Sequence, residues 1–264
     1  MRKTVRLPTI QNVVPGGTFT LACPVGMTYD RIIFKLGGTT FDESHIQNLE
    51  VIVNGKTIQT WKTGSELRLM NEYWGRGYRA GYLPIYFKRP EFRPLEQQRL
   101  TALGTADVST LTVRGDISST AVAPTLEAFA IQSEPTPLGL ISKIKRFDLS
   151  AAVAGSFEVD SIPRGPRVLA AHFLKSDINA LTCEVNSVKV LEGDKSTLEE
   201  LQKESGRVPQ SASASHLDFT LEGDILQALN TSRDIVQDLR YRLDLATAGN
   251  VPVYVEWLDS FSGV

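Results

Sequence analysis

Residues that could do chemistry are few in this chain of 264 residues. Its three histidines, His45, His172 and His216, are scattered and show neither the HxH nor the HExxH spacing of a metal site. No Gly-x-Ser-x-Gly motif occurs, and no serine or cysteine has a recognisable base partner. We therefore do not expect an enzyme, and we assign no catalytic or cofactor-binding residue. A glycosidase with two opposed carboxylates is the remaining enzymatic alternative, because Asp and Glu are abundant.

Carboxylates gather at three turns, where their oxygens could bind a hard cation such as calcium. The clusters are Asp42-Glu43, Glu192-Gly193-Asp194 and Glu222-Gly223-Asp224. Their spacing does not match an EF-hand, so ordinary acidic turns are the favoured interpretation.

Aromatic and basic side chains lie together after a short helical segment, in a mixture that is common at protein interfaces. The residues are Trp61, Tyr73, Trp74, Arg76, Tyr78 and Arg79. Trp74, Arg76, Tyr78 and Arg79 are therefore predicted interface residues. The alternative is partial burial in the core with a solvated rim.

Composition and charge restrict the class of protein. Hydrophobic residues at 42% and charged residues at 22% are ordinary for a soluble globular chain, and the net charge of −2 argues against a broad nucleic-acid-binding surface. No apolar run approaches the roughly 20 residues of a spanning helix, and the N-terminus lacks the core of a secretion signal.

The basic residues 1–6 are expected to form a mobile tail, or else to touch an anionic membrane or another protein. Cys23 and Cys183 are expected to be buried free thiols.

The elements that must position these residues occur twice in the same order. The matched pairs are Gly17–Leu21 with Gly155–Val159, Ile46–Asn54 with Ile178–Asn186, Leu111–Ile117 with Leu239–Leu245, and Pro124–Phe129 with Pro252–Trp257. The offsets are 138, 132, 128 and 128, a drift that fits small loop insertions. Four weak matches in sequence order predict two copies of one domain.

Most segments of each copy are predicted to be short strands. Alternating apolar residues indicate strands over 18–23, 111–117 and 239–245, and Asn54-Gly55 predicts a hairpin turn, with a weaker signal at Asn186-Ser187. Helices are expected over 64–73, over 94–104, from a capping box at Ser196-Thr197-Leu198-Glu199, and after Asp224.

A shared Arg-x-Asp pattern stands on the polar face of one strand in each copy. Arg114 and Asp116 in the first copy correspond to Arg242 and Asp244 in the second. These four residues are candidates for a subunit contact. A solvated face with cross-strand ion pairs is the simpler interpretation.

The boundary is predicted at the proline-containing connector 135–137, which gives domains 1–134 and 138–264. About eight short strands per copy with few helices predict an all-β protein of two tandem eight-stranded jelly-roll sandwiches. An immunoglobulin-like sandwich would be smaller and would lack the helices.

Within this architecture several segments acquire a family likeness. They are Pro24–Tyr29, Lys88–Glu91, Gln97–Thr105, Leu221–Asp224 and Gln237–Arg240. In this order they resemble the major capsid proteins of the corticovirus (PM2-like) group, within the double jelly-roll lineage of viral coat proteins. The resemblance runs nearly from end to end with small loop differences.

That resemblance implies a capsid protein whose homotrimers tile an icosahedral bacteriophage shell around a membrane and circular double-stranded DNA, assembled in the host bacterial cytoplasm. It also implies partners, namely further capsomers, a vertex protein of fivefold positions, and internal membrane proteins or lipid. Calcium support of the particle is implied too, but no calcium ligand can be carried over by position. A trimer of a duplicated domain presents six similar outlines and can fill hexagonal positions. The alternative is a carbohydrate- or receptor-binding β-sandwich of a phage spike.

Overall fold

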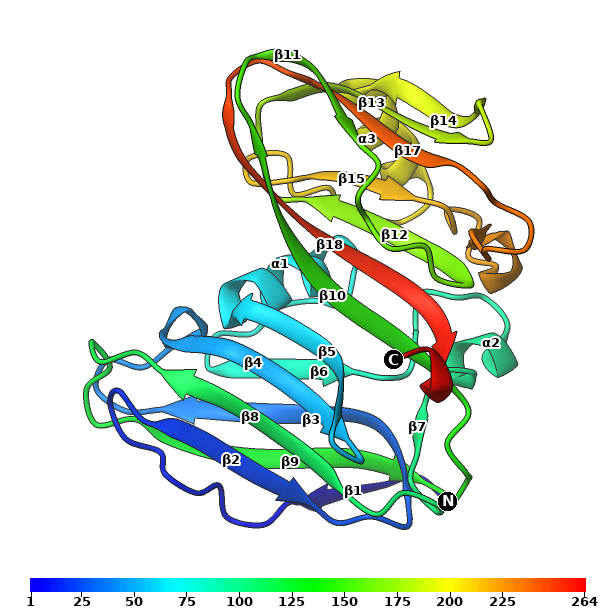
Figure 1. Ribbon diagram of the computed structural model, residues 1–264. Helices are drawn as coiled ribbons and strands as arrows, with labels where there is room; N and C mark the ends of the chain where they lie inside the picture. Colours follow the sequence, from blue (N-terminus) through cyan, green and yellow to red (C-terminus); the bar gives the residue numbers. More distant parts are fainter. The chain divides into compact units, whose positions relative to one another are not determined.

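The computed structural model describes residues 1–264, and strands dominate its regular structure (Figure 1). The chain divides into two units. The first comprises residues 1–72, 76–143 and 260–264, and the second comprises residues 73–75 and 144–259. The change from one unit to the other therefore falls inside a strand, β10 (Leu140–Ala151), after the predicted connector.

The first unit contains two sheets, ordered β1-β9-β3-β6 and β5-β4-β8-β2, with the short β7 paired to β3. Its strands are β1 (Lys3–Arg6), β2 (Thr18–Cys23), β3 (Thr28–Gly37), β4 (Ile46–Val53), β5 (Lys56–Thr63), β6 (Tyr82–Tyr86), β7 (Leu103–Gly104), β8 (Leu111–Ile117) and β9 (Thr125–Ser133). Its helices are η1 (Glu43–His45), α1 (Gly64–Tyr73) and α2 (Leu95–Arg99).

The second unit repeats this connectivity strand for strand. Its sheets run β10-β18-β12-β15 and β14-β13-β17-β11, and β16 pairs with β12 as β7 pairs with β3. The strands after β10 are β11 (Gly155–Val159), β12 (Arg167–Phe173), β13 (Ile178–Val185), β14 (Val188–Asp194), β15 (Ser215–Asp218), β16 (Leu229–Asn230), β17 (Leu239–Leu245) and β18 (Gly249–Ser260). The helices are α3 (Lys195–Glu204), η2 (Ile225–Gln227) and the terminal η3 (Phe261–Gly263). This is the predicted pair of jelly rolls.

The registers of paired strands agree with three of the four predicted sequence matches. Leu21 pairs with Val113 in the first unit, and Val159 pairs with Tyr241 in the second, at the predicted offsets of 138 and 128. The β4–β5 and β13–β14 hairpins both turn through positive-φ residues at 54–55 and 186–187 and carry a bulge at the same relative position.

The fourth match, of Pro124–Phe129 with Pro252–Trp257, is displaced by three residues from the structural equivalence. In both units the central strand bulges against its neighbour, which places Gln132 opposite Tyr29 and Trp257 opposite Val168. The structural offset of β9 and β18 is therefore 125 rather than 128. Phe129 consequently lies on an outer, half-buried face, whereas Trp257 lies in the core.

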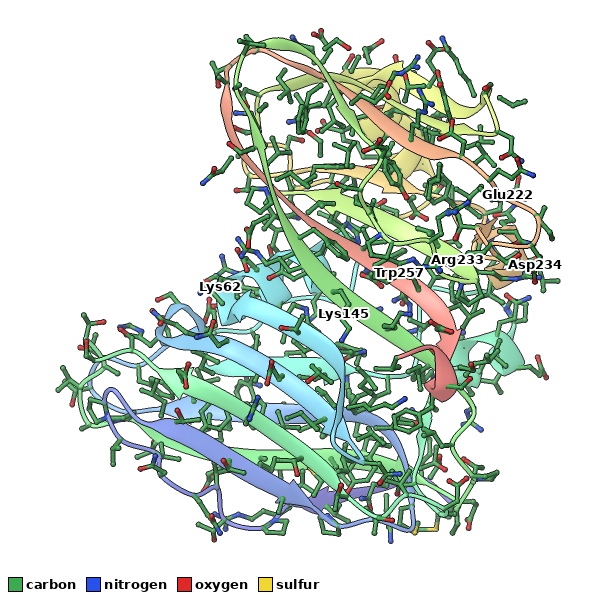
Figure 2. The ribbon with its side chains drawn as sticks, in the orientation of Figure 1. Lys62, Lys145, Glu222, Arg233, Asp234 and Trp257 are labelled. Atoms are coloured by element: carbon green, nitrogen blue, oxygen red, sulfur yellow. The ribbon has the colours of Figure 1, made fainter.

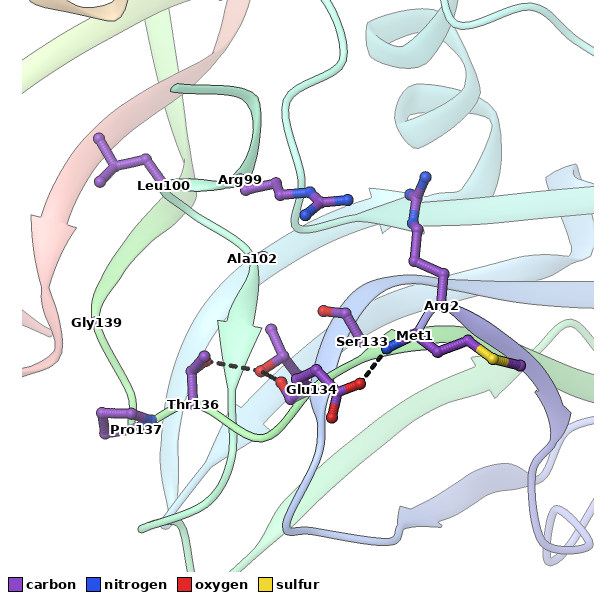
Figure 3. A pocket seen from close by; sticks show the side chains of 11 residues that line it. Met1, Arg2, Arg99, Leu100, Ala102, Ser133, Glu134, Thr136, Pro137 and Gly139 are labelled. Carbon is purple, nitrogen blue, oxygen red and sulfur yellow. Dashed lines mark hydrogen bonds and ion pairs between the residues drawn. The ribbon is translucent and has the colours of Figure 1, made fainter. Parts of the chain in front are cut away.

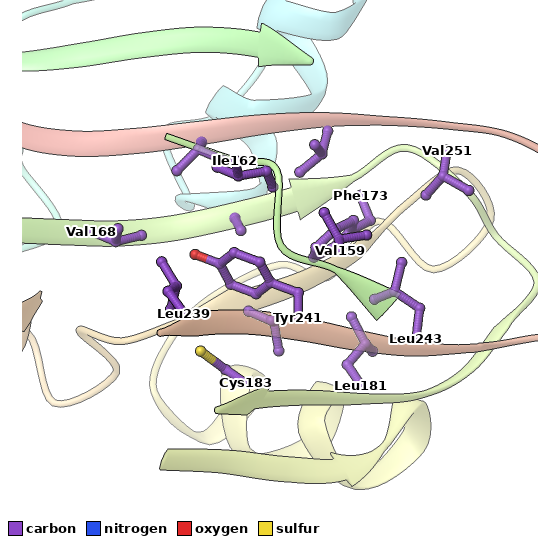
Figure 4. Packing of buried hydrophobic residues seen from close by; sticks show 14 of the residues in the cluster. Val159, Ile162, Val168, Phe173, Leu181, Cys183, Leu239, Tyr241, Leu243 and Val251 are labelled. Carbon is purple, nitrogen blue, oxygen red and sulfur yellow. The ribbon is translucent and has the colours of Figure 1, made fainter. Parts of the chain in front are cut away.

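Each unit has its own apolar core between its sheets. In the second unit Phe173, Tyr241 and Leu243 pack together with Val159 and Cys183 (Figure 4). Both cysteines are free and buried, as predicted, and burial raises the pKa of each thiol to about 12.

Three expectations about helices need correction. The second helix spans only Leu95–Arg99, because Leu103–Gly104 pairs with β3 and the backbone of Pro137 approaches Gly104 closely. α3 begins earlier than the predicted capping box, since the Asp194 carboxylate accepts from the Thr197 amide. The segment after Asp224 forms a single 3-10 turn.

The basic N-terminus is not a free tail. Residues 3–6 form β1, which pairs with β9, and Arg2 and Arg6 make ion pairs with Asp30 and Glu127. The hydrogen-bonding edge of β9 fixes this segment. No helix is both long and apolar enough to cross a membrane.

Candidate assembly surfaces

The predicted aromatic and basic patch is divided between interior and surface. Trp61 and Tyr73 are buried, and so is Trp74, which is only 3% exposed. Tyr78 and Arg79 remain exposed. The prediction of Trp74 as an interface residue therefore needs correction, because its indole is already enclosed by this chain.

Tyr73 and Trp74 occupy a polar socket in the second unit. The Tyr73 ring stacks on His216 with centroids 4.1 Å apart, and its hydroxyl lies 3.1 Å from the Asp218 carboxylate. The Trp74 indole N–H donates to Glu256 at 2.8 Å, and the Arg207 guanidinium lies over the indole ring.

Both histidines of that socket are buried and hydrogen-bonded to each other. His172 Nδ1 lies 2.8 Å from His216 Nδ1, and His172 Nε2 lies 3.2 Å from Glu256. No sequence motif predicted this cluster, because its members lie on β12, β15 and β18 and meet only through the register of these strands. Burial, followed by the neighbouring His172, lowers the pKa of His216 well below its ordinary value.

Arg76 lies inside the first unit rather than at its surface. Its guanidinium donates to Glu91 at 2.9 Å, and the two side chains are 7% and 1% exposed. Burial alone would raise the pKa of Glu91, but Arg76 and Arg89 outweigh it and leave that pKa below its ordinary value. Arg76 is therefore held by its own chain.

The two units share a motif that the sequence analysis missed. Residues 71–76 (NEYWGR) and 202–207 (QKESGR) each end a helix, turn through a positive-φ glycine and continue into an arginine. The amides of Asn71 and Gln202 donate to backbone carbonyls of β6 and β15, respectively. Arg207 pairs with buried Asp218 at 2.8 Å, as Arg76 pairs with Glu91. The common spacing of the amide, glycine and arginine was the available signal.

Tyr78 and Arg79 border an open pocket of about 460 Å³ on the outer face of β3 and β6. Arg31, Ile33, Tyr82 and Pro84 line it together with residues 76–79. Arg79 stacks over Tyr82 and makes no ion pair, and Arg31 donates to the Tyr86 hydroxyl at 3.0 Å. The pocket therefore joins aromatic surface to positive charge.

The Arg-x-Asp residues of the first unit are paired with polar side chains of neighbouring strands. Arg114 pairs with Glu50 at 2.7 Å, and Asp116 accepts from Asn48 and Thr18. These pairs match the interpretation as a solvated sheet face.

Arg242 and Asp244 occupy the equivalent face of the second unit. Arg242 bridges Glu158 and Glu184, each at 2.9 Å, and Asp244 accepts from Asn179. An exposed ion pair contributes at most about 1 kcal/mol, so neither face depends on these pairs for stability.

A second pocket, of about 420 Å³, lies beside the connector in the first unit (Figure 3). Arg2 and Arg99 contribute its basic side chains, and Thr28 and Thr136 hydrogen-bond through their hydroxyls at 2.7 Å. The N-terminal amine forms an ion pair with Glu134 there.

Comparison with known proteins follows the same division into two units. The model of the viral coat protein P2 N-terminal domain matches residues 4–134, and that of the viral coat protein P2 C-terminal domain matches residues 141–261. The chain belongs to the viral coat protein P2 family. It is 29% identical over 269 aligned positions to the major capsid protein P2 of Pseudoalteromonas phage PM2, covering 99% of this chain and 98% of that one.

Solved structures of coat proteins share the fold. The crystal structure of the PM2 major capsid protein P2 matches with a TM-score of 0.94 and 28% identity, covering 100% of both chains. The crystal structure of the STIV MCP, from Sulfolobus turreted icosahedral virus, matches with a TM-score of 0.75 over 99% of this chain and 98% of that one. At 11% identity that second likeness concerns the fold alone. The double jelly roll of this coat protein is thereby confirmed, and its family supports a structural rather than an enzymatic role.

The acidic turns named as possible calcium ligands have partners within their own chain. No group of three or more His, Cys, Asp or Glu side chains is placed to hold a metal. Asp42, Asp194 and Asp224 cap helices instead, each accepting from a backbone amide two or three residues later.

Charge is distributed unequally between the units of this coat protein. The first unit has 16 Lys and Arg against 12 Asp and Glu, whereas the second has 12 against 18. Glu222 and Asp234 lie at one end of the second unit, and Lys62 lies on β5 of the first (Figure 2). One unit is therefore net positive and the other net negative.

Proposed function

We propose that this coat protein is the major capsid protein of a PM2-like phage and that three copies form one pseudo-hexagonal tile of its shell. The observation that carries the proposal is the pair of P2 coat domains in tandem, with the full length shared with the PM2 protein. Because each chain supplies two units of one connectivity, a threefold ring presents six similar outlines.

Opposite charges support a ring in which the first unit of one copy meets the second unit of the next. Such a heterologous contact closes into a ring when the rotation between copies permits it. The excess of basic residues in the first unit and of acidic residues in the second gives each contact complementary potentials and disfavours contacts between like units.

The partners of the tile are neighbouring tiles, a vertex protein at the fivefold positions, and the proteins or lipid of an enclosed membrane. The chain provides no long insertion relative to the PM2 protein, which it matches over all of its length. The tile is therefore plain. Calcium support of the particle remains a prediction.

Light scattering of the purified protein tests the proposal. A mass of three copies at micromolar concentration is the expected result. A stable monomer under these conditions would contradict the proposal, because a shell protein at particle concentration must associate.

A further inference from the structure

Structurally equivalent faces of the two units differ in what covers them. In the second unit the outer face of β12, β15 and β18 holds residues 73–75, which are the last residue of α1 and the two residues after it. Four residues that contact Tyr73 or Trp74 are Ala170, His172, Arg207 and His216. These four define the occupied socket.

The first unit has the same socket, but this chain leaves it open. The central strands align through their shared bulges, so Arg31 and Ile33 correspond to Ala170 and His172. The edge-strand registers align Pro84 with His216, since Pro84 pairs with Ile33 as His216 pairs with His172. The shared NEYWGR and QKESGR motif aligns Arg76 with Arg207.

All four equivalents, Arg31, Ile33, Arg76 and Pro84, line the 460 Å³ pocket described above. This pocket is therefore the open socket. Its rim is charged and aromatic, with Arg79 exposed and without an ion pair. A surface that is enclosed in one copy of a domain and open in the other indicates a missing partner.

The segment equivalent to Tyr73-Trp74 is Glu204-Ser205, at the end of α3. Glu204 is exposed and makes no ion pair, and Leu201, one turn earlier, is 44% exposed. This segment therefore offers a carboxylate and an aliphatic side chain that nothing in its own unit covers.

We propose that the open socket of one copy receives the end of α3, around Glu204, from the next copy in the ring. The inference rests on the proposed function and names the contact through which the ring closes. Glu204 stands at the position equivalent to Tyr73, and Arg31 of the open socket stands at the position equivalent to Ala170 of the occupied socket. The occupied socket thus encloses aromatic rings, whereas the open one is suited to a carboxylate. Partial exposure of Leu201 and Ile33 adds apolar surface to the same contact.

Chemical cross-linking tests the contact directly. In the full-length double variant Ser205→Cys/Ile33→Cys, a short bismaleimide should join separate chains and give two- and three-chain products on a denaturing gel. Native Cys23 and Cys183 are buried and should not react. The matched control Ser205→Cys/Arg93→Cys, whose exposed arginine lies outside the socket, should give no such products.

Charge exchange provides the second test. Glu204→Arg and Arg79→Glu should each raise the dissociation constant of the trimer about tenfold or more, and the two together should restore much of the loss. Glu200→Arg, on the same helix but paired with Lys203, should change it less.

The outcomes separate the two proposals. A wild-type trimer that neither cross-links at the socket nor responds to the charge exchange would overturn this inference and leave the proposed function standing. A wild-type protein that stays monomeric would overturn both.

Discussion

The Arg89 guanidinium and the Glu91 carboxylate lie 2.5 Å apart, and each side chain is only 1% exposed. Glu91 also pairs with Arg76, so one carboxylate compensates two buried cations. Charges held this far from water are costly when their partner is lost, because no solvent can replace it.

Removal of the Glu91 charge should therefore destabilise the first unit strongly. Glu91→Gln should lower the free energy of unfolding by about 3–5 kcal/mol, measured by chemical denaturation with a probe of the first unit. Glu96→Gln, an exposed change on α2, should alter it by no more than about 0.5 kcal/mol. Equal effects of the two changes would mean that the buried network does not stabilise the fold.

The histidine pair should make the second unit sensitive to acid. The backbone N–H of Gln210 donates to His216 Nε2, so in the neutral pair His216 Nδ1–H donates to His172 and His172 Nε2–H donates to Glu256. A proton added to His216 would break one of these bonds. Glu256, Lys195 and Tyr73 are the other titratable groups near that ring.

The sign of this effect follows from the depressed pKa of His216. Below its unfolded pKa of about 6.5, the unfolded chain binds a proton that the folded chain refuses, so stability falls as pH falls from there. The melting temperature should therefore drop between pH 7.5 and pH 5.5, and His216→Gln should flatten that slope. A slope that survives His216→Gln would contradict the assignment.

Gly104 should tolerate no side chain. A Cβ there would lie 2.2 Å from the Pro137 carbonyl oxygen and 2.6 Å from that of Thr136, so the connector would have to shift. Gly104→Ala should cost about 1–3 kcal/mol of stability by overpacking. Gly139→Ala, where a Cβ meets nothing within 4 Å, is the control and should be nearly neutral. A neutral Gly104→Ala would show that the connector is loosely held.

Salt should weaken the trimer if opposite charges attract the units of neighbouring copies. The Debye length falls from about 10 Å at 0.1 M to about 3 Å at 1 M salt, so exposed charges lose most of their attraction. The trimer dissociation constant, measured by sedimentation equilibrium, should rise over this range. A constant that falls with salt would indicate a contact dominated by apolar burial.

Local signals in the sequence were sufficient for most of the fold. Asn54-Gly55 predicted its hairpin because both residues accept positive φ, and strict alternation over 239–245 predicted β17 to the residue. Offsets of 138, 132 and 128 located equivalent strands because loops, not strands, vary in length.

The remaining features depend on contacts that no local pattern encodes. Phe129 and Trp257 are both aromatic, but Phe129 lies on the outer face of its sheet and Trp257 lies in the core. The register that decides this is set by a bulge in the neighbouring strand. Trp74 was predicted to lie at the surface, but it is buried because His172 and Glu256, which lie on distant strands, contact it in the folded chain. The types of the candidate residues could therefore be recognised in the sequence, whereas their burial could be seen only in the three-dimensional structure.

Electron cryomicroscopy of particles that carry this protein would show whether three copies of the chain form each tile of the shell. We expect a shell of pseudo-hexagonal tiles, each formed by three chains whose six jelly rolls alternate around the ring. A shell built from single jelly rolls, or particles in which this chain occurs only at isolated spikes, would contradict it.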